Sequence, residues 1–155
     1  ILAPLGLKLP IYSIQGYSIT LVANSLSPRV SVTDLKNKTV YANLGKQVRI
    51  AGFVDANQRG TNIKERIEQL LLSAKNKWPQ IADYDDVIER WSHARPMMPS
   101  GVPVIGATKI NGLYLNVGHG SLGYTFAAGS AIKIANVIGH AQKNTSISRG
   151  VNYAN

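Results

Sequence analysis

A period of two in the hydrophobic pattern predicts that the first third of the chain is β-structure. Residues 13–22 alternate between two faces, as expected of a strand. One face carries Gln15, Tyr17, Ile19 and Leu21. Val30 and Val32 indicate a second, shorter strand. Residues 38–44 and 47–53 are then predicted to pair as a type II′ hairpin, because glycine comes first in the two-residue loop between them.

Residues 62–78 have the pattern of an amphipathic helix. Asn62 followed by Glu65 resembles a capping box at its start, and Pro79 ends it. Apolar residues recur at helical spacing at Ile63, Ile67, Leu70, Leu71, Ala74 and Trp78. Since the opposite face is charged, we expect the helix to cover a sheet and to serve packing alone.

The period returns to two over residues 86–95, which predicts another strand. One face of it carries Val87, Glu89, Trp91, His93 and Arg95. A turn is expected before it, at Asp83, Asp85 and Asp86. Pro96 restricts the backbone of Arg95 to extended geometry, so the direction of its side chain is fixed. The pattern leaves open whether Arg95 is a surface arginine at a strand end or holds a carboxylate in a bidentate fork.

Residues 113–117 form a short apolar strand that runs into a glycine-rich turn and a long helix. Free backbone N–H groups at such a helix start can meet a phosphate or a ring carbonyl. Small residues recur every four positions at Gly123, Ala127, Ala131, Ala135 and Gly139. This ridge indicates tight packing of a buried helix onto a sheet, or a small-residue membrane interface. Lys133 and Asn136 interrupt the apolar run and favour the first interpretation.

Length and composition set limits on the class of protein. At 155 residues the chain is long enough for one domain with its own core. The absence of cysteine excludes disulfides, thiolate metal sites and thiol nucleophiles. Residues 1–9 do not have the pattern of a signal peptide. Because the chain begins with Ile1, we expect it to be a piece of a longer protein or a processed product.

The chain has a formal net charge of +9, with 17 basic and 8 acidic residues. The positive surplus lies in residues 1–60 and 101–155, without a basic run or interleaved aromatic residues. This distribution argues against nucleic-acid binding and suits a solvated surface or an acidic partner. A non-catalytic basic module for protein assembly or membrane-surface binding is therefore one hypothesis for function.

Motifs for several other chemistries are missing from the sequence. His93, His119 and His140 do not have zinc-ligand spacing, and we predict no metal site. Neither a Gly-x-Ser-x-Gly elbow nor a phosphate-loop lysine motif is present, which disfavours hydrolases and kinases. No side chain is predicted to act as a catalytic acid, base or nucleophile.

Two long motifs lie in residues 95–108 and 113–125. The first contains Arg-Pro-Met-Met-Pro and then Pro-Val-Ile-Gly-Ala-Thr; the second reads Leu-Tyr-Leu-Asn-Val-Gly-His-Gly-Ser-Leu-Gly-Tyr-Thr. In this order they resemble the C-terminal signatures of the D-amino-acid dehydrogenase small subunit, within the flavin-dependent D-amino-acid oxidase and glycine oxidase superfamily. Shorter matching segments lie at residues 9–12, 16–20 and 48–52. The resemblance covers residues 1–139.

The resemblance implies an FAD-dependent oxidoreductase that oxidatively deaminates D-amino acids by hydride transfer to flavin. It implies that Arg95 binds the substrate carboxylate, with Tyr41 as a second contact. His93 stands where the family pattern has glycine, so it is expected in the substrate pocket and leaves the substrate's identity open. The residues implied to lie against the flavin are Gly118, His119, Gly120, Ser121, Leu122, Gly123, Tyr124 and Thr125.

The expected fold class is α+β, a mixed and largely antiparallel sheet with an amphipathic helix. Residues 1–106 would form a sheet and helix like a substrate-binding domain. Residues 107–141 would be the C-terminal strand and helix of an FAD-binding domain, and residues 142–155 a polar tail. We expect the dinucleotide-binding Gly-x-Gly-x-x-Gly turn to lie in a missing N-terminal half, so this chain alone should be inactive and retain no FAD.

Several partners follow from the same resemblance. The expected ones are a small amino-acid substrate and the missing N-terminal FAD-binding half, with no nucleic acid. Without that half, the apolar C-terminal helix is under-covered, and the chain is expected to self-associate. The expected location is the cytoplasm, either free or peripheral on the inner face of the cytoplasmic membrane.

Overall fold

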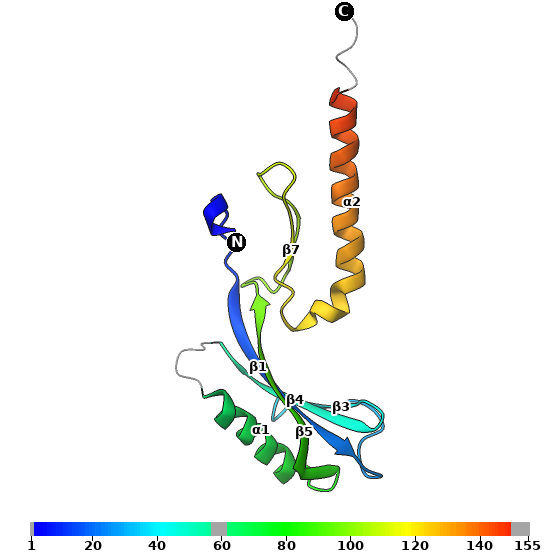
Figure 1. Cartoon of the computed structure of the whole chain (residues 1–155). Coiled ribbons are helices and arrows are strands. Elements are labelled where there is room, and N and C mark those ends of the chain that lie inside the picture. The colour runs from blue at the N-terminus through cyan, green and yellow to red at the C-terminus, as the bar shows by residue number, and fades with distance from the viewer. Residues whose placement is uncertain (1, 57–61, 150–155) are drawn as a thin grey trace, which may run out of the picture. The chain divides into compact units, whose positions relative to one another are not determined.

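The computed structural model describes residues 2–56 and 62–149, with side chains described up to residue 141 (Figure 1). The chain forms two compact units rather than the single domain that its length suggests. One unit consists of Ser13–Arg95, and the other of the residues up to Tyr12 together with those from Pro96 onward. Both helices and strands are present and the sheets are largely antiparallel, so the predicted α+β class is confirmed.

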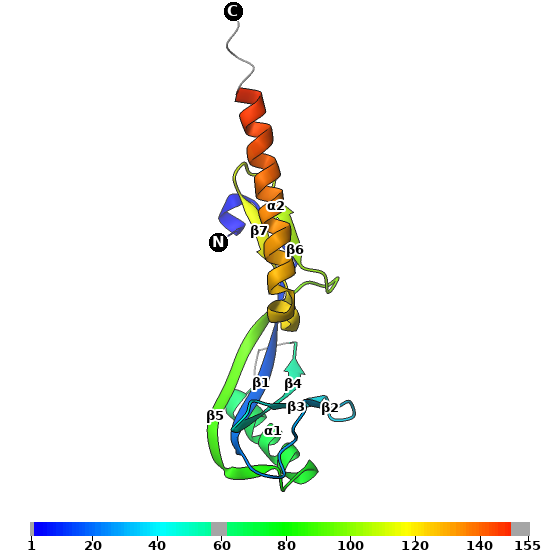
Figure 2. The same cartoon turned by 90° about the vertical axis from the view of Figure 1, so that its right-hand side faces the viewer.

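The Ser13–Arg95 unit is built on a five-stranded sheet with the strand order β2-β3-β4-β1-β5. Its strands are β1 (Tyr12–Ala23), β2 (Val32–Asp34), β3 (Thr39–Asn43), β4 (Gln47–Asp55) and β5 (Ala82–Met97). Helix α1 (Ile63–Lys77) lies against one face of this sheet in both views (Figure 1, Figure 2). The core lies between that face and the helix.

The predicted hairpin is confirmed. β3 and β4 pair antiparallel, and the Leu44 N–H donates to the Gln47 carbonyl at 2.8 Å across the turn. Gly45, the first turn residue, has φ +76°, the conformation that favours glycine at this position. The register places Tyr41 beside Ile50, which in turn pairs with Ile19 of β1. These three side chains therefore share the face of the sheet that packs on α1.

Helix α1 begins and packs as its pattern predicts. The Asn62 Oδ1 accepts the Glu65 N–H at 3.3 Å, which satisfies one backbone donor of the first turn. The buried positions of the helix are Ile67, Leu70 and Ala74. Ile63, at the start of the predicted stripe, remains 47% exposed. Burial of the remaining stripe against the sheet is the main stabilising contact of this unit.

The prediction that Asp83, Asp85 and Asp86 form a turn is wrong, because β5 already begins at Ala82. Tyr84 holds this part of the strand beneath α1, and its hydroxyl donates to the Ala74 and Trp78 carbonyls at 3.2 and 2.9 Å. The three aspartates remain exposed within the strand. β5 also continues past Pro96 to Met97, which an edge strand permits because its outer N–H positions need no partner.

The second unit contains an antiparallel pair, β6 (Val104–Ala107) and β7 (Tyr114–Val117), and the long helix α2 (Gly123–Arg149). Two short 3₁₀ helices, η1 (Ala3–Leu5) and η2 (Gly120–Leu122), complete it. α2 packs on β6 and β7. The expected boundary after residue 106 would divide β6, which pairs with β7, and the chain instead divides after Arg95.

Helix α2 differs from its prediction in length and in the side that packs. It continues to Arg149, so residues 142–149 of the expected polar tail are helical, whereas residues 150–155 lie outside the described chain. Three residues of the small-residue ridge, Ala127, Ala131 and Ala135, are exposed, whereas Ser130 is buried. The ridge is therefore not the side that packs on the sheet. In the part of the chain that the structure describes, neither α1 nor α2 is long and apolar enough to cross a membrane.

Candidate functional site

Arg95 lies near the C-terminal end of β5, and its side chain rests on β1. Tyr17 faces α1, so its neighbour Gly16 presents its α-carbon to the opposite face of the sheet. The Arg95 guanidinium lies against Gly16, because a Cβ atom at Gly16 would overlap its Nη1, Cζ and Nη2 atoms. Arg95 is partly buried, and within residues 2–56 and 62–141 it makes no hydrogen bond or ion pair. Its fork of N–H donors is available to an external acceptor.

His93 and Trp91 share the Arg95 face of β5, since they are two and four positions earlier in the strand. Their rings are stacked, with centroids 5.9 Å apart and planes inclined by 21°. The His93 Nδ1 lies 3.0 Å from the Ala94 carbonyl oxygen. Both side chains are exposed. The structure thus brings His93 and Arg95 to one open face of the sheet.

Tyr41 lies on the other face. It is 2% exposed, and its ring meets the edge of Trp78 at a centroid distance of 5.7 Å. Burial raises the pKa of the Tyr41 hydroxyl, which is therefore neutral at physiological pH. Tyr41 is a core residue beneath α1, and the structure does not bring it together with Arg95.

The glycine-rich turn after β7 has a tightly fixed backbone. Gly118 and Gly120 have φ values of +83° and +57°, which other residues rarely adopt. A Cβ atom at Gly118 would lie 2.6 Å from the Met98 Cγ, and one at Gly120 would overlap the Met97 Sδ. Met97 also forms an isolated antiparallel bridge with His119. The positive φ favours glycine at both positions, and a larger residue at either one would have to displace a methionine side chain.

The same turn exposes backbone groups that can donate hydrogen bonds to a ligand. Ser121 and Leu122 of η2 are exposed, as are Tyr124 and Thr125 at the start of α2, with Tyr124 98% exposed. The first N–H groups of a helix have no acceptor within the helix. The His119 Nε2 is buried and has no hydrogen-bond partner among the described residues. The turn can thus donate backbone hydrogen bonds to a ring carbonyl or phosphate.

A Gly-x-Gly-x-x-Gly spacing also occurs within this chain. Gly118, Gly120 and Gly123 have that spacing, between β7 and α2, and the sequence alone shows it. The surroundings differ from those of a dinucleotide-binding turn. β7 pairs antiparallel with β6, Met97 fills the space beside Gly120, and residues 101–155 contain no acidic residue to bind a ribose hydroxyl.

The sequence interpretation missed Gly16. The signal was present, since a glycine inside a strand pattern often marks close approach of another group to the backbone. The residue that approaches it, Arg95, is far away in the sequence, and only the pairing of β5 with β1 brings the two together.

Known proteins resemble this chain over most of its length. The sequence profile of the family described as FAD dependent oxidoreductase matches residues 1–137. D-amino acid dehydrogenase 2 of Pseudomonas aeruginosa is 41% identical over 137 residues, which cover 86% of this chain and 33% of that protein. D-amino acid dehydrogenase of Dechloromonas aromatica is 39% identical over 141 residues, which cover 89% and 34%. The chain spans about a third of the length of these curated relatives.

Two solved structures share the fold. Glycine oxidase from Geobacillus kaustophilus superposes with a TM-score of 0.73 at 20% identity, over 90% of this chain and 38% of that chain. Iminodiacetate oxidase from Chelativorans superposes with a TM-score of 0.70 at 22% identity, over 89% and 38%. At these identities the likeness shows that the arrangement of helices and strands is shared.

Proposed function

The chain belongs to the FAD dependent oxidoreductase family, and from that premise we propose that it is the C-terminal part of an enzyme that oxidatively deaminates D-amino acids. The names of the relatives and their identities of 41% and 39% support this reaction class. The order of the motifs in residues 95–108 and 113–125 supports the C-terminal position. The share of each relative that the chain covers, 33% and 34%, fits one part of a longer enzyme.

The observation that carries the proposal is the state of Arg95. A partly buried guanidinium, seated on Gly16 and unpaired within the described chain, is suited to an anionic ligand. A substrate carboxylate would occupy its fork and orient the α-carbon. His93 lies on the same face and would border the pocket, where it limits the space for the substrate side chain. Tyr41 has no part in this site because it is buried on the far face.

FAD is the cofactor of the family, and the turn from Gly118 to Thr125 fits one edge of it. In the complete enzyme, bound FAD would supply the acceptor for the hydride of the substrate α-carbon, and the imino acid so formed would hydrolyse to an oxo acid and ammonia. The residues proposed to lie against it are Gly118, His119, Gly120, Ser121, Leu122, Gly123, Tyr124 and Thr125. Their contribution is backbone donors at the helix start, which stabilise negative charge on a ring carbonyl.

We expect the isolated chain to be inactive and to retain no FAD. One helix start supplies contacts to a single edge of the cofactor, whereas the adenine and pyrophosphate contacts would come from the rest of the enzyme. Gel filtration of the chain with FAD tests this expectation. Stoichiometric FAD in the protein peak would contradict it.

The remaining part of the enzyme is the partner we propose for the second unit. The exposed face of α2 and an apolar groove of about 740 Å³ beside β7 would pack against it. The groove is lined by Leu2, Ala3, Leu7, Lys8, Leu9, Ile11, Leu115 and Val117. Besides the amino-acid substrate and FAD no further ligand is proposed. We place the enzyme in the cytoplasm, either free or peripheral on the inner face of the cytoplasmic membrane.

The role of Arg95 can be tested in the complete enzyme with Arg95→Lys and Arg95→Ala. A charge-assisted pair is worth about 1.5 to 3 kcal/mol, so Arg95→Ala should lower kcat/KM for a D-amino acid by about 10- to 150-fold. Arg95→Lys should have a smaller effect, because it keeps the charge but loses the fork. The amide of the same amino acid has no carboxylate and should be affected far less.

Arg90→Ala is a matched control for this experiment. Arg90 lies on β5, is exposed, and pairs with Glu68 of α1 at 3.3 Å. Its removal should change kcat/KM little for either substrate. Equal losses on the amino acid and the amide in Arg95→Ala, or a loss of flavin that accounts for the defect, would assign Arg95 a structural role.

A further inference from the structure

Gly16 lies where the pairing of β1 with β4 becomes irregular. Gly16 pairs with Val54, but the next residue, Tyr17, pairs with Gly52. Phe53 is therefore an extra residue on β4, and the ladder contains a β-bulge at this point. Phe53 has φ +59°, an uncommon conformation for a bulky residue. The bulge must be held by contacts around it.

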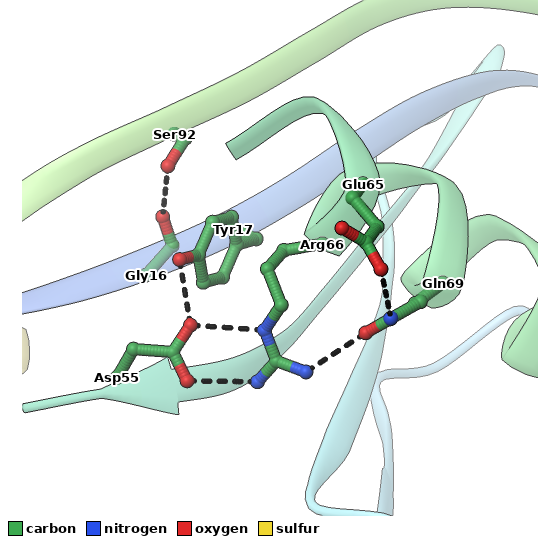
Figure 3. Close-up of polar contacts among 7 residues, drawn as sticks. All are labelled: Gly16, Tyr17, Asp55, Glu65, Arg66, Gln69 and Ser92. Atoms are coloured by element: carbon green, nitrogen blue, oxygen red, sulfur yellow. Dashed lines mark hydrogen bonds and ion pairs between the residues drawn. The ribbon is translucent and has the colours of Figure 1, made fainter. Parts of the chain in front are cut away.

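Arg66 of α1 supplies these contacts on the helix side of the sheet. Its guanidinium carbon lies 4.6 Å from the centroid of the Phe53 ring, a cation–π contact. Its Nε and Nη2 donate to the two carboxylate oxygens of Asp55 at 2.9 and 2.8 Å. The Tyr17 hydroxyl donates to the same carboxylate at 2.7 Å. Figure 3 shows the hydrogen bonds that join Tyr17, Asp55 and Arg66, which hold both strands beside the bulge.

The edge strand β5 contacts Gly16 on the side of β1 that faces away from β4. The Ser92 hydroxyl of β5 donates to the Gly16 carbonyl oxygen at 3.1 Å (Figure 3). The Gln15 side-chain amide donates in turn to the Ser92 Oγ. Gly16 is therefore a buried backbone surface whose position is fixed by these contacts. The group that covers it is the Arg95 guanidinium.

We propose that Gly16 is a positioning residue for Arg95. The bare α-carbon at the bulge sets the depth at which the guanidinium lies on the sheet, and thereby the position of the carboxylate that it binds. Gly16 acts through Arg95 and need not touch the substrate. This inference rests on the carboxylate-binding role proposed for Arg95.

The structure indicates that Gly16→Ala can fold. The φ of Gly16 is not in the left-handed region, so alanine can adopt the same backbone conformation. The three atoms nearest to the added methyl group all belong to the end of the Arg95 side chain, which is flexible and can move aside. The variant should therefore displace the guanidinium and leave the sheet in place.

The test is steady-state kinetics of Gly16→Ala in the complete FAD-loaded enzyme. KM for the D-amino acid should rise about tenfold or more with a smaller change in kcat, whereas kinetics on its amide should hardly change. A binding measurement needs no turnover. 2-Aminoisobutyrate has no α-hydrogen to transfer, so calorimetry with it and with its amide should show weaker binding of the carboxylate form alone.

Gly52→Ala is the matched control, because Gly52 pairs with Tyr17 and faces the core. A Cβ atom there would lie 2.6 Å from the Thr39 Cγ2 and 2.9 Å from the Leu70 Cδ1. This variant should lower the Tm without discriminating between the amino acid and its amide. If Gly16→Ala behaves in the same way as Gly52→Ala, its role is structural and the proposal is overturned.

A double-mutant cycle separates the inference from the proposed function. The double variant Gly16→Ala/Arg95→Ala should have the same kcat/KM as Arg95→Ala. If Gly16→Ala alone folds poorly, the double variant should have a higher Tm than Gly16→Ala, because the guanidinium that the methyl group would meet is gone. Additive losses would overturn the role of Gly16. If Arg95→Ala is selective for the carboxylate and Gly16→Ala is not, only the inference fails. If Arg95→Ala affects the amino acid and the amide equally, both fail.

Discussion

Arg66 and Asp55 join the start of α1 to the end of β4 through two parallel hydrogen bonds, with Nε to Oδ2 at 2.9 Å and Nη2 to Oδ1 at 2.8 Å. The side chains are only 29% and 21% exposed. A third donor of the guanidinium, Nη1, binds the Gln69 side-chain oxygen at 3.0 Å. A bidentate, partly buried pair is stronger than an ordinary surface ion pair. It is a bidentate polar connection between the helix and the sheet.

We expect Asp55→Asn to lower the free energy of unfolding of the chain by about 1.5 to 3 kcal/mol, because the charged acceptor of Arg66 and Tyr17 is lost. Asp85→Asn is the control. Asp85 pairs with Lys75 at 3.1 Å, but its side chain is 87% exposed, so the change should be near zero. Urea unfolding of both variants measures the difference. Equal effects would show that the buried fork adds nothing to stability.

The same pair makes stability depend on pH. The hydrogen bonds from Arg66 hold the pKa of the Asp55 carboxyl below its ordinary value of 3.8, although burial opposes them. The unfolded chain has the ordinary pKa, so between the two values it binds more protons than the folded chain. The stabilisation is therefore present above pH 3.8 and is lost as the pH falls below it toward the lower folded pKa.

The expected result is an unfolding free energy that falls in this acid range less steeply in Asp55→Asn than in the natural chain. Asp34, whose pKa is also lowered, chiefly by hydrogen bonds from Asn37, remains in both and accounts for part of the fall. Urea titrations at a series of pH values from about 5 downward provide the comparison. Parallel curves would mean that Asp55 does not contribute.

The features that the sequence predicted correctly are set by neighbouring residues. The stripe of α1, its Asn62 cap and the Gly45 turn depend on spacing over a few positions. The position of Tyr41 also depends on distant residues, because its register with Ile50 and Ile19 determines the face of the sheet on which its side chain lies. Local alternation gives two faces and does not say which one meets the helix.

The local sequence pattern did not predict the start of β5 or the contact of Arg95 with Gly16, for a related reason. The acidic residues before residue 86 suggest a turn, but burial of Tyr84 under α1 outweighs their preference and extends the strand. The Gly16 contact needs the order β1-β5 in the sheet, which no local pattern contains. Tertiary packing and strand pairing, rather than the intrinsic preferences of nearby residues, determine both the start of β5 and the contact of Arg95 with Gly16.

Gly118→Ala should destabilise the complete enzyme more than Gly112→Ala does. Both glycines have positive φ, +83° and +77°, so alanine costs about 1 kcal/mol or more of backbone strain at each. Gly112 has nothing within 4 Å of the added methyl group, whereas at Gly118 the methyl group would meet buried Met98. The difference in stability between Gly118→Ala and Gly112→Ala therefore measures the contact of the added methyl group with Met98.

Tm and flavin absorbance of the purified variants are the measurements. Because the Gly118 turn is the proposed flavin contact, Gly118→Ala should also contain less FAD per protein, while Gly112→Ala should retain it. The same Tm and the same flavin content in the two variants would show that neither the Met98 contact nor the turn geometry matters.

The exposed side of α2 is apolar. Tyr124 and Ile132 are 98% and 65% exposed, and they lie beside the exposed ridge of Ala127, Ala131 and Ala135. An apolar helix face of this kind is rarely left in water. We expect the 155-residue chain to sediment as a dimer or larger species at high concentration, because a second copy can cover this face. Ile132→Lys places a charge in the contact and should shift the chain toward monomer.

Leu72→Lys provides a matched control for Ile132→Lys. Leu72 is on α1, is apolar and is 60% exposed, so the same charge is introduced at nearly the same exposure on the other helix. Since its surroundings carry no ridge of small residues, the association should be unchanged. Sedimentation velocity over a range of concentrations distinguishes the outcomes. A compact monomer of the natural chain at every concentration would contradict self-association, and equal dissociation by both variants would show that net charge, not the α2 face, controls it.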